Sequence, residues 1–294
     1  SLRSVNQKLY KMKTQNTIKF LAVTFLLGIV FTSCQSSEGD VVAQDVVAQF
    51  SAVQVQTETE VDNITEDVSS IIDQTFADQE YANKSEENHT NRYLPDCATV
   101  TKVITDNTKD VTIDFGDACE LRNGNMVSGK IIMHYSNDKT ALTKMIDVSF
   151  DNFYNNDKKI EGGHSVLKER VNANGNPQST FTFNVNVTWS DGATASKSGT
   201  KIKELIEGND TPAWGDNVFS ISGNWAFTRK DGTVHTSTIT TPLRKELACR
   251  FIVSGVVTFQ KDGQTAVLDY GDGTCDDLGT LTKDGVTETI HLKK

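Results

Sequence analysis

Phe181-Thr-Phe-Asn-Val-Asn-Val-Thr-Trp189 is the stretch that decides the fold of this chain. Apolar residues alternate with polar residues throughout it, so that the two kinds of side chain point to opposite sides of an extended backbone. This period of two is the pattern of an antiparallel sheet that covers a core with one face. The same alternation recurs at residues 219–227 and 251–259 and, in a shorter version, at 146–150.

Short turn signals separate these runs. Asp-Gly pairs stand at 191–192, 231–232, 262–263 and 284–285, and Asn123-Gly124 belongs with them. Glycine and a few short polar residues tolerate the positive φ that tight hairpin turns require. Roughly ten to thirteen strands joined in this way form a large meander. We therefore predict an all-β fold, a large antiparallel meander that is sandwich-like or barrel-like, preceded by an N-terminal amphipathic helix.

The β region contains an internal repeat. Val111-Thr-Ile-Asp-Phe-Gly-Asp-Ala-Cys119 matches Ala266-Val-Leu-Asp-Tyr-Gly-Asp-Gly-Thr-Cys275, with one residue inserted in the second copy. An earlier cysteine, Cys97 or Cys249, precedes each copy by one strand. The two copies extend over about 97–135 and 249–293.

The four cysteines of the repeat predict two disulfides. The midpoint of Cys97 and Cys119 falls in a polar turn, and the midpoint of Cys249 and Cys275 falls in the turn at 262–263. Residues equidistant from a hairpin turn lie side by side, so each pair is expected to bridge the open end of its own hairpin. Each bridge should stabilise the fold by roughly 3 kcal/mol on the chain-entropy model. The competing arrangement joins Cys97 to Cys249 and Cys119 to Cys275.

Residues 12–34 predict export. Lys13 and Lys19 precede a mostly apolar run at 20–31, and Phe31-Thr-Ser-Cys34 then places small residues directly before a cysteine. These are the parts of a secretory signal, and their end resembles a bacterial lipobox in which Cys34 is lipidated. A transmembrane anchor is the weaker interpretation, because such a span needs about 20 apolar residues. Residues 1–11 are interpreted as an upstream extension and 12–33 as the signal peptide.

The acidic charge of the chain is concentrated in residues 35–94, which hold thirteen acidic and two basic side chains. Residues 95–294 are nearly balanced, with 22 basic and 26 acidic side chains, and show no basic patch for nucleic acid. Apolar residues in the acidic segment fall at helical spacing: Val61, Ile64, Val68, Ile71 and Ile72. We expect 34–94 to be a lipidated, acidic, largely helical linker, and 95–294 to be the β domain. The helix could serve as a stalk or coiled-coil partner, but a helix that caps the β domain is the favoured interpretation.

The sequence contains no recognisable catalytic or metal-binding motif. Its five histidines are scattered, and the acidic loop at 269–277 lacks the spacing of known calcium loops. We therefore predict no catalytic residue, metal or cofactor. Trp189 and Trp225 lie in the apolar register of their strands and are expected in the core. Trp214 is expected in a loop, after Thr211-Pro-Ala213, and is the one weak candidate for a binding residue.

Leu94-Pro-Asp-Cys-Ala-Thr-Val-Thr101, the two motif copies, the lipobox and the acidic linker together resemble outer-membrane lipoproteins of unknown function from Bacteroidota. The resemblance implies a lipid-anchored protein of the outer membrane, periplasmic or surface-exposed, and implies no activity. We expect a non-enzymatic binding or scaffolding module that contacts an envelope protein, a glycan or a lipid, and no nucleic acid. The alternatives are a barrel-like carrier of an apolar ligand, a carboxylate-dependent glycan hydrolase or an integral outer-membrane barrel.

Overall fold

The computed structural model describes residues 50–81, 94–211 and 213–292. The described residues, from Phe50 onward, form one compact unit, so the helix and the sheet belong to the same packed body. Cys34 and the expected signal peptide and upstream extension lie outside the described residues.

One helix precedes fourteen strands in the described part of the chain. The helix is α1 (Ala52–Tyr81). The strands are β1 (Thr99–Ile104), β2 (Thr108–Asp114), β3 (Cys119–Glu120), β4 (Met126–Ser136), β5 (Thr143–Asn155), β6 (Lys158–Glu169), β7 (Gln178–Thr188), β8 (Thr194–Glu207), β9 (Val218–Thr228), β10 (Val234–Glu246), β11 (Ser254–Lys261), β12 (Gln264–Asp272), β13 (Leu278–Lys283) and β14 (Val286–His291).

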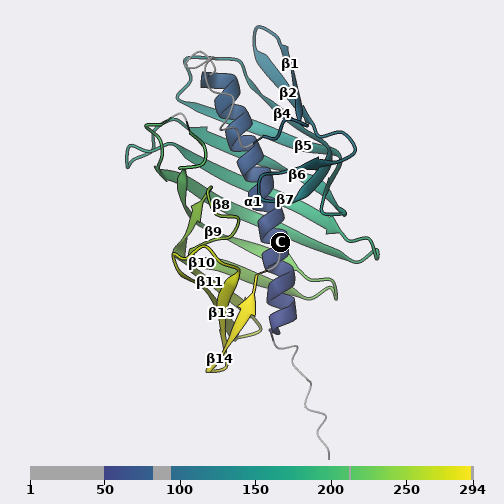
Figure 1. The fold of residues 1–294 in the computed structure, drawn as a ribbon, viewed down its shortest axis with the longest axis vertical. Helices are drawn as coiled ribbons and strands as arrows, with labels where there is room; N and C mark the ends of the chain where they lie inside the picture. The colour runs from purple at the N-terminus through teal and green to yellow at the C-terminus, as the bar shows by residue number, and fades with distance from the viewer. Residues whose placement is uncertain (1–49, 82–93, 212, 293–294) are drawn as a thin grey trace, which may run out of the picture. The chain divides into compact units, whose positions relative to one another are not determined.

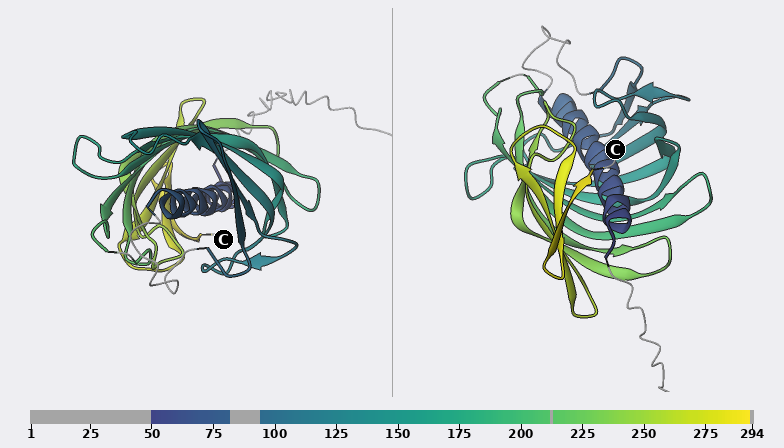
Figure 2. Two further views of the ribbon diagram at one scale, coloured as in Figure 1. Left: turned by 90° about the horizontal axis from the view of Figure 1, so that it is seen from above. Right: turned by 60° about the horizontal axis from the view of Figure 1, so that its bottom comes forward.

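All fourteen strands belong to a single antiparallel sheet (Figure 1). Neighbours in the sheet are neighbours in sequence from β1 to β14, except that the short β3 pairs with β4 beside the main path. The predicted meander is therefore confirmed, and its strands form one layer, barrel-like rather than a sandwich. The sheet curls around α1, which crosses its concave side obliquely (Figure 2).

A capping box starts α1. The Ser51 hydroxyl accepts a hydrogen bond from the Gln54 backbone N–H, and the Gln54 side-chain oxygen accepts one from the Ser51 N–H. Two backbone donors at the helix start are thus satisfied reciprocally, which fixes where the helix begins. The helix then runs without a break for 30 residues.

The predicted turns fall into two geometric classes. At 262–263 and 284–285 both the aspartate and the glycine have positive φ, which is the two-residue hairpin turn whose twist matches the flanking strands. At 191–192 and 231–232 only the glycine has positive φ, and the turn closes as a longer loop. There Gly192 N–H bonds to the Trp189 carbonyl, and Trp189 N–H bonds to the Ala193 carbonyl.

Glycines inside the strands let the sheet curl. Gly129 has a φ of 78° at a register shift between β4 and β5, and a Cβ at this position would lie 1.9 Å from the Asn152 carbonyl oxygen. Gly162, with a φ of 98°, would bring a Cβ to 2.0 Å from the Asn184 carbonyl oxygen. A side chain at either position would push the neighbouring strand away, so glycine is required for the bend.

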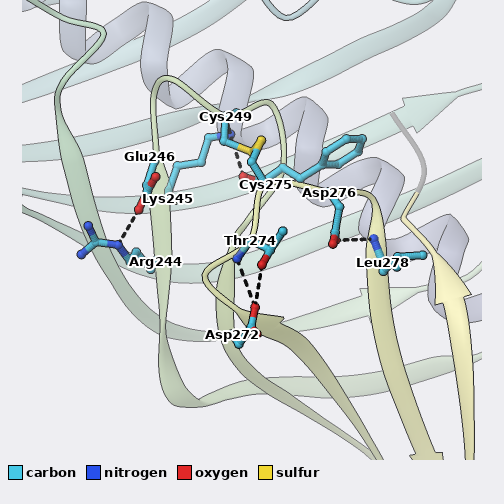
Figure 3. Close-up of a disulfide and its surroundings, with 10 residues drawn as sticks. Arg244, Lys245, Glu246, Cys249, Asp272, Thr274, Cys275, Asp276 and Leu278 are labelled. Atoms are coloured by element: carbon cyan, nitrogen blue, oxygen red, sulfur yellow. Dashed lines mark hydrogen bonds and ion pairs between the residues drawn. A yellow bond between two sulfur atoms is a disulfide. The ribbon is translucent and has the colours of Figure 1, made fainter.

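Both predicted cysteine pairs lie at disulfide distance. Cys97 bonds to Cys119 and Cys249 bonds to Cys275, each with an S–S distance of 2.05 Å. The second bridge closes the loop after β10 onto the loop after β12 (Figure 3). The first aspartate of each motif copy plays the same part, since Asp114 accepts the Gly116 N–H and Asp269 accepts the Gly271 N–H, both at 2.9 Å.

Candidate functional site

The concave face of the sheet and α1 meet through buried charges as well as apolar side chains. On α1 the acidic residues Glu58, Asp62, Glu66, Asp73 and Glu80 are spaced by four, four, seven and seven residues, which places them on one stripe of the helix. The apolar residues that predicted the helix form a second stripe and are all buried. Seven lysines of the described strands are buried on the facing sheet: Lys109, Lys144, Lys168, Lys197, Lys201, Lys203 and Lys245.

The C-terminal half of α1 is bound to the first half of the sheet. Glu80 pairs with Lys109 of β2 at 2.7 Å and with Lys144 of β5. About two helical turns earlier, Asp73 pairs with Lys168 of β6 and, at 3.2 Å, with Lys203 of β8. Burial by itself would raise the pKa of the Asp73 carboxyl, but the charges of these two lysines hold it below its usual value.

The middle of α1 faces β8, which turns three lysines inward. Asp62 pairs with Lys197, whose side chain is fully buried between the rings of Trp225 and Phe183. Glu66 lies 3.4 Å from Lys201. Burial lowers the pKa of Lys197 well below its usual value, and the neighbouring charge of Lys201 lowers it further.

Glu58 at the N-terminal end of α1 is the most completely bonded of these acids. Its carboxylate accepts hydrogen bonds from Trp225 Nε1 at 2.7 Å and from Ser237 Oγ at 2.6 Å, and it lies 2.5 Å from His235 Nε2. Burial alone would raise the pKa of Glu58, but the bond and the charge of His235, with the bonds from Ser237 and Trp225, bring it below its usual value.

This pairing gives the acidic segment a structural role. Burying one charge without its partner is strongly unfavourable, so the lysines and carboxylates require one another at these positions. Their order along α1 also fixes how the helix lies. Glu58 and Asp62 near its start meet β8 to β10, Asp73 meets β6 and β8, and Glu80 at its end meets β2 and β5. We name this set of charges the buried charge seam.

His164 of β6 lies beside the buried charge seam. Its burial should make the stability of the fold sensitive to acid. Its ring is buried against Phe150, Phe181 and Phe183, and neither ring nitrogen has a hydrogen-bond partner among the described residues. Burial lowers the pKa of His164 to about 4, against the opposing charge of Glu66. The unfolded chain therefore takes up the proton first, near pH 6.5, and about 3 kcal/mol of stability is lost as the pH falls from there to 4.

Replacing His164 with phenylalanine should remove this part of the acid sensitivity. Urea unfolding at pH 7 and pH 4.5 measures the loss of stability between the two values, which should be smaller by about 2 kcal/mol in the variant than in the unaltered protein. The control is His134→Gln, which removes an exposed ion pair with Asp110 and should change the loss by less than about 1 kcal/mol. An equal loss in His164→Phe and the unaltered protein would show that His164 is not buried in its neutral form.

A cavity of about 300 Å³ opens where the two repeat copies meet α1. Its wall comes from three separate parts of the chain: the helix at 63–70, the loop before β4 at 122–125 and the segment from the end of β10 to the second disulfide at 245–252. Cys275 completes the wall. We name this cavity the repeat crevice.

Three side-chain amides donate hydrogen bonds to Asp67 of α1, on the side of the repeat crevice formed by the first repeat copy. Asn123 Nδ2 donates to it at 2.6 Å, Asn125 Nδ2 at 2.7 Å and Asn155 Nδ2 at 3.0 Å. Burial raises the pKa of Asp67 above its usual value, even though the three amides and the charge of Lys245 favour the ionised form. The loop of the first repeat copy is thereby attached to the helix.

The second side of the repeat crevice is held by two cations. Lys245 donates to the Cys249 carbonyl at 2.8 Å, and Arg250 Nη2 donates to the Asn123 carbonyl at 2.5 Å, so Arg250 bridges the two copies. Figure 3 shows Lys245 reaching toward the disulfide while Arg244 points away to Glu246. Burial lowers the pKa of Lys245 to about 8, against the charges of Asp67 and Glu66.

The residues singled out from the sequence occupy different places. Cys249 and Cys275 line the repeat crevice. Trp214 is half-buried and packs against the core, as does Trp189, whereas Trp225 is buried within it. In the described part of the chain, no group of three or more histidine, cysteine or acidic side chains could hold a metal ion. No helix there is long and apolar enough to cross a bilayer.

Sequence reasoning missed the residues that define both sites. The lysines of the seam carried a usable signal, because Lys197, Lys201 and Lys203 fall in the same register of β8 as the buried Ala195. Asp67, Asn125 and Arg250 had no local signal, since they come together only in the folded chain.

Comparison of the chain with protein-family models, with curated proteins and with solved structures finds no match.

Proposed function

We propose that this chain is a lipid-anchored protein of the cell envelope that acts as a non-enzymatic binding or scaffolding module. The observation that supports this most is the filling of the concave face. Helix α1 occupies the space in which a barrel-like carrier would hold its ligand, and the helix and sheet satisfy each other's charges. Binding is then left to the surfaces around this core.

Two surfaces suit that role. The repeat crevice offers a cavity of monosaccharide size with both polar and apolar walls, at the lower end of the usual range for small-molecule sites. The convex face offers a row of uncharged side chains, each with a hydroxyl or an amide group, in register across six strands. The row consists of Ser165, Thr182, Thr200, Asn224, Thr238 and Thr258. This row of side chains is polar and uncharged, which suits contact with neutral or hydroxylated partners.

Metabolic labelling tests the anchor. The chain is expressed in a bacterial host fed an alkyne fatty acid, and label on the purified protein is compared with that on Cys34→Ser. We expect label and membrane association for the unaltered chain and neither for the variant. Ser33→Ala keeps a small residue before the cysteine and should still be labelled. Equal labelling of the unaltered chain and Cys34→Ser would refute attachment at Cys34.

An assay for hydrolysis tests the non-enzymatic role. The purified protein is incubated with envelope polysaccharides and model glycosides, and we expect no products. Product formation that disappears on replacing a single carboxylate of the repeat crevice, Glu66 or Asp67, would replace the binding function with a hydrolase.

A further inference from the structure

We infer that the repeat crevice binds a small hydroxylated carboxylate, that is, a sugar acid, either free or at the end of a glycan. This inference rests on the proposed binding function and names the ligand class of one of its surfaces. It is carried by the charges, the hydrogen-bond groups and the size of the cavity.

The charges of the crevice favour an anion. Its wall contains three cations, Arg122, Lys245 and Arg250, against the two carboxylates Glu66 and Asp67. Glu66 already faces lysines of β8, at 3.4 and 3.7 Å, which offset its charge. This local excess of positive charge stands out in a chain whose net charge is −10.

The arginines have the chemistry to bind a carboxylate. A guanidinium presents paired N–H donors in a plane and binds carboxylates with two parallel hydrogen bonds. Arg122 and Arg250 belong to the two opposed loops, and the bond from Arg250 Nη2 to the Asn123 carbonyl holds its guanidinium at the junction between them. It packs over Gly124, where an added Cβ would lie 3.6 Å from Nη2.

Hydroxyl groups on the ligand would meet the acceptors in the wall. Glu66 lines the crevice, and its Oε2 lies 3.7 Å from Lys203 but accepts no hydrogen bond among the described residues. Asn63 and Ser70 add further polar groups along the helix. A cavity of about 300 Å³ accommodates one sugar ring rather than a lipid chain or a long oligosaccharide.

Nuclear magnetic resonance titration tests the inference on the full chain carrying Cys34→Ser. The probes are D-glucuronate, its methyl glycoside, D-glucose and acetate. We expect saturable shifts of the Asn123 and Asn125 side-chain amides with glucuronate, and binding of glucose and acetate at least about tenfold weaker. Tight binding of the methyl glycoside would identify a glycan end as the source, and its exclusion would identify the free acid.

Variants place the ligand in the crevice. Arg250→Gln should weaken glucuronate binding about tenfold or more, and so should Arg122→Gln from the opposite loop. Arg244→Gln is the matched control, because Arg244 pairs with Glu207 and Glu246 outside the crevice, and it should change binding less than about twofold. Equal binding of glucose and glucuronate, or no saturable shift, would overturn the inference. Either result would leave the proposed binding function intact, because that function is contradicted by the hydrolysis assay and not by this titration.

Discussion

Replacing Glu58 with leucine should lower the free energy of unfolding by about 3–5 kcal/mol, one of the two largest effects expected for a single substitution. The leucine would leave the Trp225 indole N–H, the Ser237 hydroxyl and the His235 ring without their shared acceptor. Each donor would then be buried without a partner, and each such loss is unfavourable by about 1–3 kcal/mol. Urea unfolding at pH 7, monitored by tryptophan fluorescence and circular dichroism, measures the change.

Glu60→Leu is the control for this prediction. Glu60 lies on the same helix and makes an ion pair with Lys158 at 3.1 Å in which both side chains are partly exposed. Its replacement should lower stability by about 1 kcal/mol or less. Equal effects of the two substitutions would mean that Glu58 does not have its three buried partners.

Replacing Asp62 with leucine should have an effect of similar size, about 3–5 kcal/mol, because it removes the carboxylate paired with the fully buried Lys197. The reverse substitution, Lys197→Met, should be milder, at roughly 1–2 kcal/mol. Asp62 then still has Lys201 within 4.0 Å, whereas Lys197 without Asp62 has no comparable carboxylate on α1 within ion-pair distance among the described residues.

The double variant distinguishes a pair from two independent residues. Asp62→Leu with Lys197→Met removes both charges and leaves apolar side chains beside Trp225, so it should be more stable than Asp62→Leu alone. Glu161→Gln, at an exposed pair with Lys159, should change stability by less than about 0.5 kcal/mol. Additive losses in the double variant would show that Asp62 and Lys197 do not interact.

Local patterns predicted the sheet well. The period of two in 181–189 identified the inward residues of β7, and the Asp-Gly pairs identified hairpin turns of the sheet. The cysteine pairing followed from the hairpins, since it needs only the distance of each cysteine from a turn. These features depend on residues close in sequence, so strands, turns and cysteine pairs can be predicted from a single sequence.

The position of α1 and the repeat crevice depend on contacts between distant residues. The favoured interpretation places the helix against the β domain, but the sequence assigns its acidic residues only to a largely helical linker and predicts no partner for them. A buried acid is recognisable only beside its partner, and Asp62 and Lys197 are 135 residues apart. The crevice likewise joins Asp67 to Asn125 and Arg250 to Asn123 across 58 and 127 residues.

Hydrogen exchange of α1 tests most directly the claim that this helix is the interior of the fold. The full chain carrying Cys34→Ser is exchanged into heavy water at pH 7, and peptides of α1 are compared with peptides of β7 and β9. If the buried charge seam holds the helix, amides between Glu58 and Phe76 should exchange as slowly as those of the two strands, because all three are exposed only by unfolding of the whole unit. Rapid exchange of α1 beside protected strands would instead mean that the helix is a detached stalk, and would contradict the account.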